Sequence, residues 1–275
     1  MYSIFAKKFP KICVCAIFVV PLQANCEESM NIIAHIGEYF LLMGKTFRWP
    51  DRQRMFWRQV SHEMEKQGLE SILITLIVSV FMGAIMTMQT KLNTSNPLLP
   101  VYTTGLVTRD CILLEFSSTI LCLLLAGKVG SNIASEIGTM RITEQIDALE
   151  IMGVNSANYL ICPKVLAFMV MMPLLVTLSM ATGLLGGYVI SAVTDILTVD
   201  EYLIGIQYAF VPYYVWYSFV KTVVFAYIIT SMASYYGYYA YGGALEVGKA
   251  STKAVVNSSI VILLMDVVLT KLMLV

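Results

Sequence analysis

Long apolar runs without any charge constrain this chain more than any other feature of its sequence. Residues 165–194 contain no Asp, Glu, Lys or Arg, and neither do residues 71–90. Because a helix rises 1.5 Å per residue, about 20 such residues cross the hydrocarbon core of a bilayer. Charged residues make up 13% of the chain, roughly half the fraction of a soluble domain. Alternating strands of about ten residues, as in a membrane β-barrel, are not seen. The sequence therefore predicts an all-α integral membrane protein.

We expect about five transmembrane helices, three of which carry at least one charged residue. An additional apolar segment at 202–211 ends at Pro212 and is expected to form a separate short helix, because proline ends helices. The five predicted spans are approximately residues 71–90, 111–127, 165–192, 213–235 and 254–272.

Lysine and arginine between the spans predict the orientation of the chain, because these residues concentrate in cytoplasmic loops. If the segment after Met30 lies inside, eleven of them fall on the inner side, and only Lys91 and Arg109 fall outside. This arrangement places residues 128–164 and 236–253 in the cytoplasm and the C-terminus outside. The eleven inner residues are Lys45, Arg48, Arg52, Arg54, Arg58, Lys66, Lys128, Arg141, Lys164, Lys249 and Lys253.

The first 29 residues allow two interpretations. Three lysines followed by an apolar stretch at 12–22 and Ala24-Asn25-Cys26 are typical of a signal peptide. The alternative is an upstream start codon, with Met30 as the true beginning. We favour the alternative, because cleavage of a signal would place the basic segment after Met30 outside the cell. Residues 1–29 are thus a signal-like or mis-started extension.

Residues 30–70 are amphipathic and basic, without enough uncharged length to span a membrane. Aromatic side chains such as Trp49 and Trp57 alternate with arginines such as Arg54 and Arg58. This composition is typical of helices that lie in the membrane interface. A soluble cytoplasmic helix pair is the competing interpretation.

Residues 127–153 have helical periodicity but lie between two spans. Thr143 is the expected N-cap of a short acidic helix, with Glu144 and Asp147 in the first turn, where the helix dipole favours acids. Gly153 is the expected C-terminal stop. An acidic amphipathic helix on the cytoplasmic side suggests that a partner docks there.

Charged residues inside the predicted spans include Glu115, Lys221 and Asp266. Each costs about 2.5–3.5 kcal/mol at a span centre, so they should face the bundle interior, a cavity or each other. They are candidates for the polar lining of a substrate headgroup path, together with Gln89; a structural hydrogen bond or ion pair is the alternative. Glu115, five residues into its span, could also lie near the outer surface. Gly183 and Gly187 form a GxxxG motif, which predicts close helix packing.

Several chemistries lack a signature in this sequence. There is no GxxxxGK[ST] phosphate loop, no GxSxG and no HExxH. The six cysteines form no CxxC pair, and with two histidines there is no zinc-site spacing. No nucleophile–base pair is evident. We therefore expect a non-catalytic chain without a metal, in which any nucleotide is bound by another subunit.

The run GKVGSNIASEIGTMRITEQIDALEIMGV resembles the signature of the MlaE (or YrbE) permeases of ABC-type phospholipid transporters. The later run YGGALEVGKASTKAVVNSSIVILLMDVVLT is similar to the C-terminal segment of that family, and residues 83–89 resemble the end of its first span. The similarity covers residues 31–275 and defines a permease domain at 71–275.

This resemblance implies the inner-membrane permease of a Gram-negative bacterium that moves phospholipids between the two membranes and so maintains outer-membrane lipid asymmetry. It implies a homodimer whose partners are an ABC ATPase (MlaF-like) that binds ATP and Mg²⁺, a periplasmic MCE-domain protein (MlaD-like) and, in some systems, a STAS-domain protein (MlaB-like). No nucleic acid is implied.

The resemblance also implies that residues 131–153 are a coupling segment that enters a groove on the ATPase. The residues expected to carry this coupling are Glu136, Arg141, Glu144, Gln145, Asp147, Leu149 and Glu150. The docking face could be formed by the acids at 144, 147 and 150 or by the apolar stripe at 146 and 149. The chain departs from the family at Leu114, where an arginine is usual, so that Glu115 must find another partner or be protonated.

Two other functions fit the same sequence. An ion-coupled secondary transporter would use Glu115 and Asp266 as proton carriers, although the internal repeats common in such transporters are not found. A membrane scaffold would anchor the periplasmic MCE protein without moving lipid.

Overall fold

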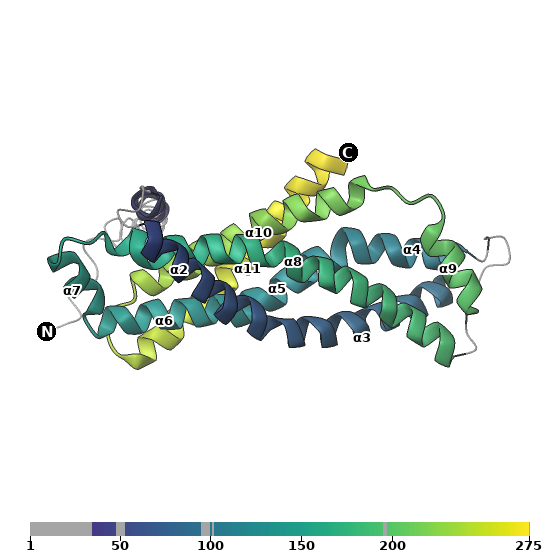
Figure 1. Cartoon of the computed structure of the whole chain (residues 1–275), viewed down its shortest axis with the longest axis horizontal. Helices are drawn as coiled ribbons and strands as arrows, with labels where there is room; N and C mark the ends of the chain where they lie inside the picture. Colours follow the sequence, from purple (N-terminus) through teal and green to yellow (C-terminus); the bar gives the residue numbers. More distant parts are fainter. Residues whose placement is uncertain (1–34, 48–52, 95–99, 101, 195–196, 275) are drawn as a thin grey trace, which may run out of the picture. The chain divides into compact units, whose positions relative to one another are not determined.

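The computed structural model describes residues 35–47, 53–94, 100, 102–194 and 197–274 (Figure 1). The N-terminal extension at 1–29 lies outside these residues. Within the described ranges every regular element is helical, as the sequence predicts. Five of these helices are long and apolar enough to cross a membrane, which confirms an all-α membrane protein. They comprise Gln53–Asn93, Thr103–Ile142, Ser156–Val193, Tyr213–Tyr238 and Ala244–Leu274.

The chain divides into two compact units, residues 1–47 and 48–275. In the first unit the structure describes one helix, at 35–46, within the segment predicted to be amphipathic. The second unit contains all five long helices and is the subject of the following paragraphs.

The first long helix joins α2 (Gln53–Met64), the π-helical turn η2 (Glu65–Leu69) and α3 (Glu70–Asn93). It therefore continues without a break from the predicted interfacial segment into the predicted first span. Residues 53–70 extend the helix by about 27 Å beyond the start of the uncharged run at Ser71.

The second long helix contains two π-helical segments. It runs through α4 (Thr103–Cys111), η3 (Ile112–Ile120), α5 (Leu121–Leu125), η4 (Ala126–Gly130) and α6 (Ser131–Ile142). π-Helical turns inside α-helices are often found at functional sites. The predicted second span and the first half of the predicted coupling segment are thus one continuous rod.

The short helix α7 (Gln145–Ile151) follows α6, and the predicted N-cap at Thr143 is wrong. Thr143 instead ends α6: its N–H and its hydroxyl both donate to the Thr139 carbonyl, at 3.0 and 2.8 Å. The hydroxyl is therefore not directed at the first turn of α7. Glu144 takes the N-cap position, with φ 60°, in the left-handed region. Gly153, with φ 77°, ends α7 as predicted, because the left-handed region suits glycine.

The remaining helices are α8 (Ser156–Val193), α9 (Val199–Gln207), α10 (Tyr213–Tyr238) and α11 (Ala244–Leu274). Helix α8 begins nine residues before the predicted span, and Pro163 and Pro173 lie inside it. Helix α9 is the predicted short helix before Pro212. Thr198 and Glu201 form a capping box at its N-terminus.

Within the second unit, α6 and α7 lie at one end of the bundle, and α4 and α9 lie at the other (Figure 1). Helix α3 packs along α8, α2 packs on the first part of α8, and α6 packs against α10 and α11. This arrangement carries the predicted coupling segment to one end and the charged span residues to the middle.

Glycines bring α3 and α8 into close contact. A Cβ atom at Gly83 would strike the carbonyl group of Gly183, and one at Gly186 would strike the carbonyl group of Val80. Gly187 lies against the hydroxyl groups of Tyr202 and Thr87. The predicted GxxxG pair, Gly183 and Gly187, therefore lies at a helix contact inside one protomer.

We expect Gly186→Ala to destabilise the protein by about 1–3 kcal/mol, because the added methyl group meets backbone and forces α3 and α8 apart. The matched control is Gly248→Ala in α11, where a Cβ atom meets nothing within 4 Å. Thermal unfolding in detergent measures both variants. Equal midpoints for the two would contradict this account of the packing.

Candidate functional site

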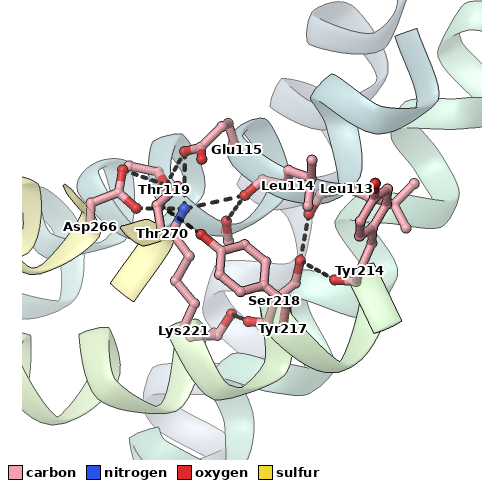
Figure 2. Close-up of polar contacts among 12 residues, drawn as sticks. Leu113, Leu114, Glu115, Thr119, Tyr214, Tyr217, Ser218, Lys221, Asp266 and Thr270 are labelled. Carbon is pink, nitrogen blue, oxygen red and sulfur yellow. Dashed lines mark hydrogen bonds and ion pairs between the residues drawn. The ribbon is translucent and has the colours of Figure 1, made fainter. Parts of the chain in front are cut away.

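The central feature of the bundle is a lysine placed between two carboxylates. Lys221 on α10 has no exposed surface, and its Nζ lies 3.0 Å from Glu115 Oε2 and 2.5 Å from Asp266 Oδ1 (Figure 2). The three predicted span charges, which come from three different helices, therefore meet at one point. We call Glu115, Lys221 and Asp266 the membrane triad.

Other groups complete the environment of the Lys221 ammonium. It donates hydrogen bonds to the Leu114 carbonyl at 3.2 Å and to Glu115 Oε2, and it forms an ion pair with Asp266. Thr119, which lies within hydrogen-bond distance of Glu115 Oε2 and Asp266 Oδ2 at 3.0 and 3.3 Å, can donate to one carboxylate at a time. The ring of Tyr217 lies 5.2 Å from Nζ, in the range of a cation–π contact.

The π-helical segment η3 shapes this site from the second long helix. Its residues Leu113 and Leu114 present carbonyl groups to α10, where Ser218 Oγ donates to the first at 2.5 Å and Lys221 Nζ to the second (Figure 2). π-Helical turns shift the direction of backbone and side chains relative to an α-helix. Glu115 lies on this segment and faces Lys221.

Charge and exposure are unequal within the membrane triad. One ammonium faces two carboxylates, so the formal charge is −1 when both acids are ionised. Lys221 has 0% of its side-chain surface exposed and Asp266 16%, whereas Glu115 has 44%. Glu115 is therefore the member that can contact a ligand without displacing a helix.

Two sequence expectations about this site can be compared with the geometry. Glu115, which was expected to need a partner other than residue 114, forms an ion pair with Lys221. Gln89, the fourth candidate, is exposed on α3 and is not among the hydrogen-bond partners of the membrane triad. Sequence reasoning missed Thr119, although its position four residues after Glu115 in a helix was a usable signal.

The second candidate site is the end of the bundle formed by α7. Two of its three acids bind other parts of the chain: Asp147 Oδ1 lies 2.5 Å from Arg141 Nη1, and Glu150 Oε1 accepts from the hydroxyls of Ser156 and Tyr238 at 2.8 and 2.9 Å. These contacts attach α7 to α6, α8 and α10.

The outward face of α7 is mixed in character. Ile146 is completely buried and Leu149 is half-buried, so the apolar stripe faces the protein. Glu144 and Gln145 are exposed, and Glu144 forms no ion pair with any residue that the structure describes. Ile151 and Met152 expose 87% and 67% of their surfaces. The free surface thus combines an acid and an amide with an apolar tip.

Glu136 does not belong to this free surface. Its carboxylate lies 3.0 Å from Lys66 Nζ and 2.9 Å from Lys164 Nζ. Burial raises the pKa of Glu136, but the two ammonium groups outweigh that effect and hold the pKa below its ordinary value.

No group of three His, Cys, Asp or Glu side chains in the described ranges could hold a metal ion. The expectation that ATP and Mg²⁺ are bound by a partner ATPase, with no cofactor in this chain, stays a prediction.

Comparisons with known proteins agree with this architecture. The family model "Permease MlaE" matches residues 60–272. A probable ABC transporter permease protein of Rickettsia bellii is 36% identical over 90% of this chain and 95% of its own length. The intermembrane phospholipid transport system permease protein MlaE of Haemophilus influenzae is 29% identical over 93% of this chain and 97% of its own. The chloroplast protein TRIGALACTOSYLDIACYLGLYCEROL 1 of Arabidopsis thaliana is 29% identical over 79% of this chain and 62% of its own.

We expect Lys221→Met to destabilise the protein by about 3–5 kcal/mol, because it leaves two carboxylates side by side without a cation. Thermal unfolding in detergent measures the loss. The control is Lys271→Met, at an exposed position in the last turn of α11. The triple variant Glu115→Gln, Lys221→Met, Asp266→Asn should recover most of the lost stability. An unchanged midpoint for Lys221→Met would show that the ion pairs do not stabilise the fold.

Proposed function

The chain belongs to the MlaE permease family, and on that basis we propose that it is the non-catalytic membrane subunit of an ABC transporter for phospholipids. The observation that carries the proposal is the continuous second helix, Thr103–Ile142. It bears Glu115 of the membrane triad within the predicted second span, and its last part, α6, is the first half of the segment that resembles the coupling segment of the family. A partner acting at one end of this helix can therefore influence a polar site about 40 Å away.

The proposed setting is the inner membrane of a Gram-negative bacterium. The excess of lysine and arginine on one side supports a cytoplasmic position for α7 and a periplasmic C-terminus. The proposed assembly is a homodimer with an MlaF-like ATPase, which binds ATP and Mg²⁺, and with an MlaD-like MCE protein in the periplasm. An MlaB-like STAS protein would bind the ATPase in some systems.

The outward face of α7 supports a specific docking arrangement. Asp147 and Glu150 hold α7 to the permease, and Ile146 is buried. The ATPase groove would then receive Glu144, Gln145 and the apolar tip formed by Ile151 and Met152. Of the two faces considered from the sequence, only Glu144 from the acidic face takes part; Gln145 and the apolar tip, which belonged to neither face, complete the proposed contact.

The membrane triad would line the lipid path. The half-exposed carboxylate of Glu115 can accept from the ammonium of a zwitterionic headgroup while Lys221 stays bound to Asp266. A change in the position of the second helix would alter how far Glu115 lies from Lys221. The two states would differ in the distance between Glu115 and Lys221. ATP-driven movement of the second helix and headgroup binding to Glu115 would each shift the balance between them, as coupling requires.

One observation favours a second candidate, an ion-coupled secondary transporter. The membrane triad has one more carboxylate than cation, and a carboxylate without its own partner can carry a proton. That function predicts transport driven by a gradient without an ATPase. A membrane scaffold, the third possibility, predicts that substitutions on α7 have no effect.

We expect the double variant Ile151→Asp, Met152→Asp to weaken co-purification with the ATPase at least about tenfold, because apolar anchors dominate such interfaces. Glu144→Lys with Asp147→Lys should reduce both binding and lipid transfer. The control is Asp200→Lys, an exposed charge reversal on α9 at the other end of the bundle. Normal binding and transfer in both double variants would rule out coupling through α7 and favour the scaffold.

Glu115→Gln and Asp266→Asn should each lower ATP-dependent lipid transfer at least about tenfold, because each loses a charge-assisted contact worth about 1.5–3 kcal/mol. Proteoliposomes containing the ATPase complex provide the measurement, with Lys271→Met as the control. Normal transfer in both variants would remove the membrane triad from the lipid path. Gradient-driven transfer by the permease alone would favour the secondary transporter.

A further inference from the structure

A second buried lysine lies near the α7 end of the bundle. Lys164 on α8 is 1% exposed, and its Nζ lies 2.6 Å from Glu63 Oε1 and 2.9 Å from Glu136 Oε2. Lys66 approaches the same Glu136 oxygen at 3.0 Å. We call Glu63, Lys66, Glu136 and Lys164 the four-charge cluster; its two cations and two anions balance.

The four-charge cluster joins three segments that are distant in sequence. Glu63 lies in the last turn of α2 and Lys66 lies in η2, and their spacing of three residues puts both side chains on one face. Glu136 comes from α6 and Lys164 from α8. Gln67 also takes part, since its amide donates to Glu63 Oε2 at 2.6 Å.

Backbone packing does not explain how α6 is held to these partners. Helices α2 and α8 pack directly on each other, and Gly68 allows Met171 of α8 to approach the first long helix closely. Helix α6 packs chiefly against α10 and α11. The side chains of the four-charge cluster therefore form the main polar connection between α6 and the α2–α8 pair.

The energy of a buried ion pair depends strongly on the presence and the position of both partners. Removing one partner leaves an uncompensated buried charge, whereas neutralising the whole group can leave stability unchanged. The attraction also requires good geometry, because desolvation must be offset by short contacts. A displacement of α6 is therefore opposed unless α2 and α8 move with it.

We propose that Lys164 is a positioning residue for the coupling segment, holding α6 to the α2–α8 pair so that movement of α7 is passed on to the first and third spans. This inference rests on the proposed function. Lys164 touches neither lipid nor nucleotide in this scheme, and it acts through Glu136 and Glu63. Its removal should reduce the lipid moved per ATP hydrolysed more than it reduces ATPase binding.

The test uses the complete complex with its ATPase in proteoliposomes and measures lipid transferred per ATP hydrolysed. The main variant neutralises the four-charge cluster with Glu63→Gln, Lys66→Gln, Glu136→Gln and Lys164→Met, which leaves the net charge of the chain unchanged. We expect wild-type thermal stability and ATPase binding but about a tenfold lower transfer ratio, within the range of coupling between distant sites. Lys164→Arg, which keeps the cation, should retain most of the ratio.

Lys249→Met is the matched control, because Lys249 forms an exposed ion pair with Glu246 at 2.7 Å on α11 and should not affect the ratio. A wild-type ratio in the neutralised variant would overturn the inference and leave Lys164 a structural residue. Failure of the wild-type chain to bind an ATPase or to transfer lipid would instead overturn the proposed function itself.

Discussion

The cost of placing charge in a low-dielectric interior governs how this bundle is arranged. Lys221 is buried at mid-span and is tolerated because two carboxylates and a carbonyl group surround its ammonium. Those acceptors come from the second and fifth long helices, so satisfying one lysine fixes three helices relative to each other. The glycine contacts between α3 and α8 add the complementary constraint, since two backbones meet there with no room for side chains.

The same solution occurs twice along the second long helix. Glu115 and Glu136, 21 residues apart on one rod, each face a buried lysine that also binds an acid from a third helix. Lys221 reaches Asp266 of α11, and Lys164 reaches Glu63 of α2. The second long helix is therefore bound by ion pairs at two places, within the membrane triad and within the four-charge cluster near α7. A displacement of this helix would affect both sites.

The sequence predicted the residues of the membrane triad better than those of the four-charge cluster. A charge isolated in an apolar run stands out, and its cost requires a partner, so Glu115, Lys221 and Asp266 could be identified before any geometry was known. Which of them would pair depended on how the spans pack. The pairing of Lys164 with Glu63 was not predicted, because both residues lie outside the uncharged runs. Charged residues in such positions are typical of solvent-exposed loops. The helices continue past those runs, and hydropathy does not mark that extension. The cap at Thr143 was wrong for a local reason: its hydroxyl bonds back to Thr139.

The two prolines of α8, the third long helix, make it easier to bend at two turns. Proline at position 163 has no N–H for the carbonyl of Tyr159, and Pro173 likewise leaves the carbonyl of Met169 without its helical donor. Bending stiffness is therefore lowest at these two turns. Lys164, which directly follows Pro163, forms ion pairs with Glu63 of α2 and Glu136 of α6. These ion pairs therefore stabilise α8 at the turn where its backbone is less rigid. Helix α8 therefore has two turns with an interrupted backbone hydrogen bond: ion pairs support the first, and the second lies within residues 165–194, which carry no charge.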